Sequence, residues 1–575
     1  MAIKISGNTV IDDSRNITSS GTMSANAYIG DGSQLTNLPG GGNVLTATAS
    51  GTLADGDPVV VNTDGTVSAA ALVTSGWIVT LGGTGAEGCH GIGADSSGNS
   101  YIAGWTDSGN AGSYDILIAK YNTSGVIQWQ RTLGTTGFEY SNAQNANQAA
   151  VDSSGNVYVS GTGNAAGAGS YDLVIAKYNT SGAIQWQRTL GGTSSDQNGG
   201  VAVDSSGNVY ITGYTNSAGQ GDADALIVKY NTSGVIQWQR TLGGSNAEYG
   251  YGIAVDSSGN VYISGTTNTA GVIVGGYDML IAKYNSSGTI QWQRTLGLSN
   301  NDQGNSIGVD SSGNVYVVGY ENGGGQVIIV KYNNSGTIQW QRYLDGGSTE
   351  LGWGMVIDSS DNIYINGVTR SEGNGNQNFL IVKYNTSGDL QWQRYLGGTN
   401  HDYGYGIATD NSGSIYVSGH TASAGAGSND ILIAKLPNDG SATGTYGSYT
   451  YAAGSASSGE SSLTSNTPGY TSSTSNLTDQ ASSLTSASSS LTSSTTSMAA
   501  TNLTSENFIG ISDGAYSNSQ SATIQLAGSV DDAQSGLTPG SKYYVQNNGT
   551  LSTTADSPSV FAGTAVATTK LIVKN

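Results

Sequence analysis

The chain has 575 residues, a formal net charge of −21 and a single cysteine, Cys89. One cysteine excludes an intramolecular disulfide and a cysteine-cluster zinc site, and the excess of acidic residues argues against nucleic acid as a partner. No run of about 18 apolar residues occurs, so no membrane-spanning helix is expected. The 6 prolines all lie outside residues 59–436. Since proline is excluded from central strands, this gap outlines a large sheet-built domain.

Residues 45–72 precede that domain and contain a short β pattern. The stretch DGDPVVVNTDGTVSA at 55–69 has two apolar runs around an NTDGT turn. Such runs on either side of turn residues predict two short strands.

Three phrases recur through the proline-free region and define a repeat. QWQR, with WIVTLGG as a degenerate first copy, supplies Trp77, Trp129, Trp186, Trp238, Trp292, Trp340 and Trp392. A DSSGN-like phrase begins at Asp95, Asp152, Asp204, Asp256, Asp310, Asp358 and Asp410. The third phrase, IAKY or a variant of it, contains Lys120, Lys177, Lys229, Lys283, Lys331, Lys383 and Lys435. The spacing of 48–57 residues indicates one supersecondary unit per repeat.

Each repeat predicts four short antiparallel strands, as the unit around Asp256 illustrates. GYGIAVDS and VYISGTT flank the SSGN turn, and DMLIAKY and TIQWQRTLGG flank the NSSG turn. Four-stranded units repeated radially predict an all-β fold, a β-propeller over residues 73–440. Strands one to three occur seven times after residue 85, whereas strand four occurs six times there and once before, at Trp77. The count predicts seven blades closed by the Trp77 strand, with 445–451 as the competing closing strand.

The next segment, residues 441–503, differs in composition. Residues 461–500 include 24 serines and threonines among 40 positions. An apolar residue returns every seven positions, at Leu463, Tyr470, Leu477, Leu484, Leu491 and Met498. A seven-residue period is typical of a supercoiled helical stalk, but serine and threonine are weak helix formers. The segment is therefore predicted to be either a trimeric stalk or an extended linker.

Residues 504–575 return to short β patterns, including ATIQLAG, KYYVQNNGTLS and TKLIVKN. The two ends of a propeller leave from the same blade, so it can be inserted without separating the halves of a host domain. We therefore expect 45–72 and 504–575 to form one small β domain that carries the propeller as an insert.

Two resemblances add to these patterns. The D-x-x-G-N-x-Y hairpins and IAKY strands resemble the bacterial and phage beta-propeller repeat family over about residues 77–436, which implies the fold and little about function. MAIKISGNTVIDDSRNITSSGT, YIGDGSQLTNL and the closing FAGTAVATTKLIVKN resemble the ends of tail-fibre and related virion proteins of marine phages such as cyanophages. That second resemblance implies a phage virion component in which residues 1–44 serve attachment or oligomerisation.

One acidic residue precedes each first strand: Glu87, Glu139, Asp196, Glu248, Asp302, Glu350 and Asp402. In a propeller these positions share a face with the loops between strands two and three, so the acids should ring one mouth of the channel. Their carboxylates either accept backbone N–H groups in their turns or bind a structural Ca²⁺ or Mg²⁺ ion. Repetition once per blade favours the first interpretation, and no cofactor is expected.

The loops between strands two and three vary while the frame repeats, which is typical of a binding face. Aromatic and polar side chains there are the candidate ligand contacts: Trp105, Tyr171, Tyr320, Arg370 and His420. Stacking of the aromatic rings on sugars is the expected mode, and the negative net charge favours a neutral glycan. Neutral drift of loop residues is the alternative interpretation.

No catalytic motif surrounds the three histidines, His90, His401 and His420, so no enzymatic activity is expected. The first functional hypothesis is a phage virion structural protein, a tail-fibre-like adhesin whose propeller contacts a host-surface glycan or protein. The alternative is a virion decoration or assembly protein with a non-receptor propeller. Both hypotheses place the chain in the virion as a homotrimer, with other virion proteins as partners and without nucleic acid or membrane insertion.

Overall fold

The computed structural model describes most of residues 72–466 and shorter segments on either side of that range. Within 72–466 the residues that it leaves undescribed are 109–112, 141–147, 165–169, 269–275, 298–299, 322–324, 374–375 and 462. The chain divides into two compact units, one of residues 1–74 with 499–575 and one of residues 75–498. The described residues form strands and turns, and none belongs to a helix that could cross a membrane.

The larger unit is built from four-stranded antiparallel sheets, each of which we call a blade. Blade one consists of β7 (Glu87–Ala94), β8 (Ser100–Thr106), β9 (Asp115–Tyr121) and β10 (Ile127–Gly134). Blade two consists of β11 (Glu139–Tyr140) with β12 (Ala149–Val151), then β13 (Val157–Gly163), β14 (Asp172–Tyr178) and β15 (Ile184–Gly191). Blade three consists of β16 (Asp196–Val203), β17 (Val209–Thr215), β18 (Asp224–Tyr230) and β19 (Ile236–Gly243).

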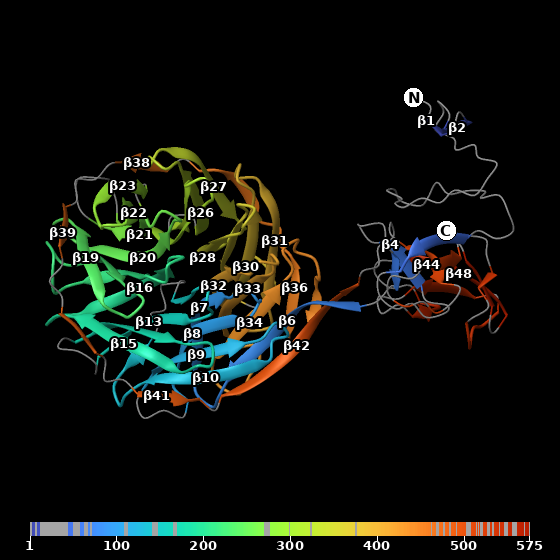
Figure 1. Cartoon of the computed structure of the whole chain (residues 1–575), viewed down its shortest axis with the longest axis horizontal. Helices are drawn as coiled ribbons and strands as arrows, with labels where there is room; N and C mark the ends of the chain where they lie inside the picture. Colours follow the sequence, from blue (N-terminus) through green and yellow to red (C-terminus); the bar gives the residue numbers. More distant parts are fainter. Residues whose placement is uncertain are drawn as a thin grey trace. The chain divides into compact units, whose positions relative to one another are not determined.

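The remaining blades follow in chain order around a common centre (Figure 1). Blade four consists of β20 (Glu248–Val255), β21 (Val261–Thr267), β22 (Asp278–Tyr284) and β23 (Ile290–Gly297). Blade five consists of β24 (Asp302–Val309), β25 (Val315–Glu321), β26 (Gln326–Tyr332) and β27 (Ile338–Asp345). Blade six consists of β28 (Glu350–Ile357), β29 (Ile363–Thr369), β30 (Asn378–Tyr384) and β31 (Leu390–Gly397). Blade seven consists of β32 (Asp402–Thr409), β33 (Ile415–Thr421), β34 (Asp430–Leu436) and β6 (Leu72–Gly82).

The DSSGN turn explains why strands one and two form a hairpin. In blade four, one carboxylate oxygen of Asp256 accepts the backbone N–H groups of Ser258 and Asn260, each at 2.9 Å. Its other oxygen accepts the Asn260 amide at 2.8 Å and the Tyr262 hydroxyl at 2.9 Å. Gly259 supplies the positive φ of 77° that the turn requires. The Lys283 ammonium lies 5.2 Å from the Tyr262 ring centroid, so turn, hairpin and third strand are tied together.

Each blade is fastened to the next by the tryptophan and arginine of QWQR. Trp186 Nε1 donates to the Thr232 carbonyl at 3.0 Å, and Arg188 Nε donates to the Gly234 carbonyl at 2.8 Å, both in the next blade. The indole bond recurs from Trp77, Trp129, Trp186, Trp238, Trp292, Trp340 and Trp392. Trp77 of blade seven donates to Thr123 of blade one at 3.0 Å. The innermost strands of these two blades, β32 and β7, are also in contact.

The contact between neighbouring blades requires a glycine next to the tryptophan ring, and this requirement can be tested. Gly234 has a φ of 73°, and a Cβ there would lie 2.7 Å from the Trp186 ring. Gly347 has a φ of 87° with nothing within 4 Å of its Cβ position. We expect Gly347→Ala to cost about 1 kcal/mol of unfolding free energy for the backbone conformation alone, and Gly234→Ala to cost about 1–3 kcal/mol more for the clash. Equal losses in chemical denaturation would show that the tryptophan does not hold the junction.

The strand that contains Trp77 completes blade seven. Trp77 lies opposite Lys435 in the ladder between β6 and β34. The competing segment instead forms β35 (Gly444–Tyr446) and β36 (Tyr449–Ala453) on the outer edge of blade six, where Tyr451 lies opposite Leu396. The hydrogen-bonded ladder thus pairs the N-terminal strand, and not residues 445–451, with β34.

Residues 449–501, which we call the belt, add a fifth strand to the outer edge of every blade. The pairs are β36 on β31, β37 (Ser457–Glu460) on β27, β38 (Thr464–Asn466) on β23, β39 (Thr471–Thr474) on β19, β40 (Thr478–Ala481) on β15, β41 (Thr485–Ser488) on β10 and β42 (Thr492–Thr501) on β6. The belt therefore visits blades six to one in reverse order and ends on blade seven. Figure 1 labels β38, β39, β41 and β42 along the periphery of the ring. Pairing covers the edges that four-stranded blades would otherwise expose.

For the described residues of 441–503 the predicted helical stalk is wrong, and the extended alternative is only partly right because these residues are paired rather than free. The seven-residue period is the step from one blade edge to the next, since β38 to β42 each begin seven residues after the previous strand. Seven extended residues span at most ~25 Å. The positions Tyr470, Leu477 and Leu484 lie outside the described residues.

The belt also contributes to the core. Leu463 is buried among residues of blades four and five, Leu491 among those of blades seven and one, and Met498 among those of blades six and seven. The second glutamine of QWQR fixes the same points: Gln341 Nε2 donates to the Leu463 carbonyl at 3.0 Å and Gln130 Nε2 to the Leu491 carbonyl at 2.9 Å. These three apolar residues of the period therefore fill wedges between neighbouring blades.

The smaller unit contains strands from both ends of the chain. β3 (Val44–Thr48) pairs with β44 (Ser521–Gln525), and β4 (Pro58–Val61) pairs with β43 (Phe508–Ser512) and β5 (Val67–Ala69). A second sheet consists of β45 (Val530–Asp531), β46 (Lys542–Val545), β47 (Leu551–Ser552), β48 (Val560–Ala567) and β49 (Lys570–Val573). Nearer the N-terminus, β1 (Ile3–Ile5) pairs with β2 (Asn8–Ile11). The other residues before Val44 lie outside the described part of the chain.

Candidate functional site

The acids that precede the first strands are fully buried: Glu87, Glu139, Asp196, Glu248, Asp302, Glu350 and Asp402. In six of them a carboxylate oxygen accepts the backbone N–H of the residue four positions earlier, at 2.6–2.8 Å. The second oxygen of Glu248 accepts the Thr267 hydroxyl at 2.8 Å. The described residues contain no group of three or more His, Cys, Asp or Glu side chains that could hold a metal ion. In these turns the acids accept backbone N–H groups, as the first interpretation expects. Binding of a metal ion by these acids stays a prediction.

A second acid, the first residue of strand three, lies against the acid of the next blade. Asp224 of blade three and Glu248 of blade four both abut Gly243, where a Cβ would lie 1.7 Å from Asp224 Oδ1 and 2.9 Å from Glu248 Oε2. Burial, reinforced by the charge of Glu248, raises the pKa of Asp224 to about 7. The same causes raise the pKa of Asp115 beside Glu139 to about 6 and that of Asp278 beside Asp302 to about 7.

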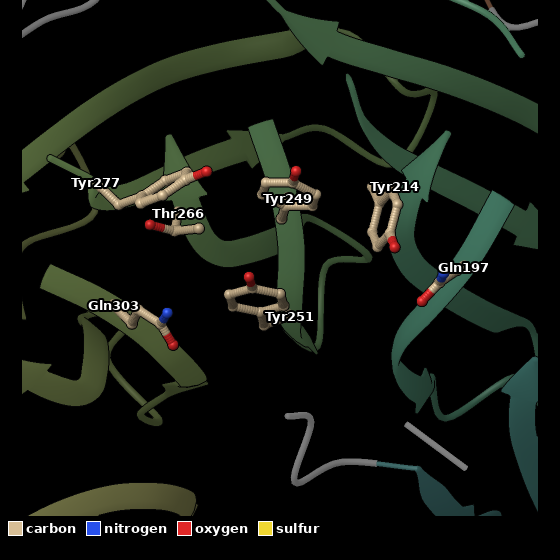
Figure 2. A pocket seen from close by; sticks show the side chains of 7 residues that line it. All are labelled: Gln197, Tyr214, Tyr249, Tyr251, Thr266, Tyr277 and Gln303. Carbon is tan, nitrogen blue, oxygen red and sulfur yellow. The ribbon is translucent and has the colours of Figure 1, made fainter. Parts of the chain in front are cut away.

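A pocket of about 400 Å³ opens among blades three, four and five (Figure 2). Its lining residues are Gln197 on β16, Tyr214 on β17, Tyr249 and Tyr251 on β20, Thr266 on β21, Tyr277 before β22 and Gln303 on β24. Ring centroids lie 4.7 Å apart for Tyr214 and Tyr249, and 6.4 Å apart for both Tyr249 with Tyr251 and Tyr249 with Tyr277. Four aromatic rings thus surround a hollow that no charged side chain lines. We call it the tyrosine pocket.

A β-bulge in the first strand positions Tyr251. The register between β20 and β21 shifts between Gly250 and Gly252, so Tyr251 has no residue opposite it in that ladder. Tyr249 lies opposite Thr266, which also lines the tyrosine pocket. Local backbone geometry, rather than a long loop, therefore presents these two rings.

The chemistry of the tyrosine pocket is uncharged and rich in hydrogen-bonding groups. Burial raises the pKa of Tyr214, Tyr249 and Tyr251, so their hydroxyls stay protonated at neutral pH. The amides of Gln197 and Gln303 can both donate and accept. Aromatic faces combined with neutral donors and acceptors suit a ligand that has an apolar face and several hydroxyl groups.

Two of the residues predicted from the loops lie away from the tyrosine pocket. Trp105 is on β8, with its ring 4.9 Å from that of Tyr114 in an edge-to-face contact. Tyr171 forms an isolated bridge with Ser195, and its carbonyl accepts the Asp196 N–H at 2.7 Å. Neither residue lines the tyrosine pocket.

The other three predicted residues occupy blades five to seven. The Tyr320 ring lies 5.8 Å from that of Trp353, and the His420 ring lies 4.7 Å from that of Tyr403. Burial lowers the pKa of His420 to about 4, so its imidazole is neutral at pH 7. Arg370 is exposed, and with the Gln377 amide turned so that its oxygen faces the guanidinium, Nη2 and Nε donate to it at 2.7 and 3.0 Å.

Reasoning from the variable loops misses most of the tyrosine pocket, because strands one and two supply six of its seven residues. One signal for it does exist in the sequence. In EYGYGIAV of blade four, aromatic residues stand one and three positions after the acid. Those positions hold Gly88 and His90 in blade one, so the repeat itself marks them as variable.

A second hollow has a structural explanation. It is lined by Lys177, Gln185, Trp186, Gln187, Arg188, Thr232 and Ser233. These residues include the tryptophan and arginine that fasten blade two to blade three. Because the same contact recurs at every junction, this hollow belongs to the frame.

Comparison with known proteins agrees with the propeller-like repeats. The family described as Beta-propeller repeat matches residues 77–110, 185–219, 237–271, 291–325 and 391–425. Among curated proteins, the chain is similar to "Regulatory protein FlaEY" of Caulobacter vibrioides, at 25% identity over 167 residues. That match covers 25% of this chain and 18% of FlaEY, so the chain spans under a fifth of that relative's length.

Solved structures with a similar fold include enzymes at very low identity. A puromycin hydrolase mutant matches at 10% identity and a TM-score of 0.36, covering 60% of this chain and 51% of that one. The polysaccharide lyase Uly1 matches at 10% identity and a TM-score of 0.35, and the match covers 69% of this chain and 100% of that one. A gluconolactonase from Xanthomonas campestris matches at 11% identity and a TM-score of 0.31, and the match covers 53% of this chain and 91% of that one. Identities this low carry no activity over to this chain.

Proposed function

We propose that the blades form one closed, seven-bladed β-propeller that includes most of the belt and takes up the unit of residues 75–498. The uninterrupted series of inter-blade tryptophan bonds, from Trp77 round to Trp392, supports this ring. The propeller would be inserted between the two parts of a small β domain, 45–72 and 504–575. Shared sheets such as β3 with β44 support that arrangement.

We further propose that the propeller is a binding module for a neutral glycan of a host cell surface. The observation that carries this proposal is the tyrosine pocket, in which four phenol rings and two amides surround an uncharged hollow. Sugars present apolar C–H faces to aromatic rings and hydroxyl groups to amides. The negative net charge of the chain disfavours strongly anionic ligands.

The setting of this activity would be a phage particle, with the chain as a tail-fibre-like structural protein. Support comes from the resemblance of both chain ends to fibre-type virion proteins. The homotrimer now rests on that resemblance alone, because the belt accounts for the seven-residue period that also suggested it. Immunogold labelling of purified particles with an antibody against the chain tests this setting, and unlabelled particles would contradict it.

Removing rings from the tyrosine pocket should weaken glycan binding. We expect the full chain to bind neutral oligosaccharides on a glycan microarray, and Tyr249→Ala and Tyr214→Ala each to weaken binding by about 1–2 kcal/mol, roughly five- to thirtyfold. The matched control is Tyr395→Ala, because Tyr395 is a half-buried tyrosine on the outer strand β31 and outside the tyrosine pocket. If the Tyr249 and Tyr214 variants keep full affinity while folded, the tyrosine pocket is not the binding site.

A further inference from the structure

The tyrosine pocket is one part of a longer aromatic surface. In every blade the residue after the acid lies opposite a residue of strand two. These cross-strand pairs are Gly88 with Trp105, Tyr140 with Thr162, Gln197 with Tyr214, Tyr249 with Thr266, Gln303 with Tyr320, Leu351 with Val368, and Tyr403 with His420. All pairs but the blade-six one contain an aromatic ring, which strand two and strand one supply alternately in blades one to five. Paired side chains lie on one face of each sheet, so these residues form what we call the aromatic rim.

The aromatic rim continues from the tyrosine pocket to blade seven. Trp353 lies at the bulge of β28 in blade six, whose cross-strand pair is aliphatic. Its ring lies 5.8 Å from Tyr320 on one side and 5.6 Å from Tyr405 on the other. Tyr405 in turn stacks on Tyr403 at 6.5 Å.

Gln303 links the tyrosine pocket to this series, because it lines the pocket and lies opposite Tyr320 of blade five in the ladder between β24 and β25. Tyr320, Trp353 and Tyr403 are half-buried, so part of each ring remains accessible. Accessible rings thus follow one another over blades four to seven.

We propose that the ligand is an extended neutral polysaccharide that occupies the tyrosine pocket and continues along the aromatic rim to Tyr403. This inference rests on the proposed glycan binding and adds the length and path of the ligand. A single sugar would contact the tyrosine pocket alone and would not reach the aromatic rings of blades five to seven. A chain of sugar rings can stack on successive aromatic rings, and each added contact acts within one bound molecule, which raises affinity without a new encounter.

The test compares two ligand lengths on the full chain by isothermal titration calorimetry. The probes are cellobiose and cellohexaose, maltose and maltohexaose, mannobiose and mannohexaose, and chitobiose and chitohexaose. For a series that binds, we expect the hexasaccharide to bind about tenfold or more tightly than the disaccharide. Trp353→Ala and Tyr403→Ala should remove that gain while leaving disaccharide affinity unchanged. Tyr395→Ala, a half-buried tyrosine on the outer strand β31 of the same blade and outside the aromatic rim, is the matched control and should change neither affinity.

The possible outcomes separate the two proposals. Equal affinity for both lengths would overturn the extended ligand and leave glycan binding standing. The same would follow if Trp353→Ala and Tyr403→Ala, each with a wild-type melting curve, kept the full length dependence. If one variant fails to fold, the other decides on the same criterion. Absence of binding for every probe would overturn both proposals.

Discussion

A fragment of residues 75–440 should fail to unfold cooperatively, whereas residues 75–498 should melt in a single sharp transition. The shorter fragment lacks the belt, so it exposes the outer edges of the blades and empties the wedges that Leu463, Leu491 and Met498 occupy. Exposed edges invite pairing between molecules, so we also expect aggregation. Circular dichroism with light scattering on both fragments measures the difference.

Point variants separate the side chains of the belt from its backbone pairing. Leu463→Ala and Leu491→Ala should each lower the unfolding free energy by about 2–5 kcal/mol, since both side chains are buried between blades. The matched controls are Val126→Ala and Val235→Ala, because these valines are 53% and 52% exposed on hairpin turns. Cooperative unfolding of 75–440 at the temperature of 75–498, with no loss in the leucine variants, would mean that the belt is an accessory strand.

The blade frame is readable from the sequence because each phrase has a local physical reason. Asp256 organises its own turn, and the Trp186 indole reaches only to the adjacent blade. Such contacts recur at a fixed separation, so their spacing is visible in the chain. The belt is different, because its partners lie hundreds of residues away, as with Gln130 and Leu491. Its seven-residue period is plain in the sequence. The same period is expected for a coiled coil and for an extended chain that pairs with the edge of one blade after another.

The candidate site was only partly predictable for a related reason. Variable loops point to Tyr320 and His420, which do lie on the aromatic rim. The tyrosine pocket depends on Tyr251, which lies at a bulge of the first strand. The same bulge recurs in blades one, three, five, six and seven, so it belongs to the repeated frame. The amino-acid pattern varies at this position but does not by itself indicate the bulge.

The second large effect on stability is expected from neutralising the acid pairs between neighbouring blades. In blade six the first residue of strand three is Asn378 instead of an aspartate, and it lies beside Asp402. The chain thus already tolerates a neutral amide at the position that Asp224 occupies in blade three. We therefore expect the triple variant Asp115→Asn, Asp224→Asn, Asp278→Asn to fold and to be more stable than the wild type at pH 8.5. A pKa displacement of one unit corresponds to about 1.4 kcal/mol, and relaxation and water access reduce it, so we expect about 1–2 kcal/mol per residue.

The sign of the pH dependence follows from proton binding. Asp115 has its pKa raised to about 6 and Asp224 and Asp278 to about 7, above the unfolded value of about 3.9. The folded state therefore binds more protons between pH 4 and 7, and stability falls as the pH rises through this window. His420 acts in the opposite direction, because its pKa is lowered to about 4 and unfolding takes up a proton below pH 6.5. Its contribution is constant above that pH, so it does not mask the effect of the acids from pH 6.5 to 8.5.

Across pH 6.5 to 8.5 the wild type should lose stability and the triple variant should lose less, as measured by denaturant unfolding, because Asp402, Asp430 and Cys89 still have raised pKa values in the variant. Asp204→Asn and Asp256→Asn are the matched controls. Hydrogen bonds from their own turns hold the pKa of these aspartates below its usual value, outweighing the effect of burial. Their charged form is the one the fold uses, so their loss should destabilise the protein at pH 8.5. A triple variant that is weaker than the wild type at pH 8.5 would show that the paired acids are held ionised, as attractive partners of a bound cation rather than as neighbours that share a proton.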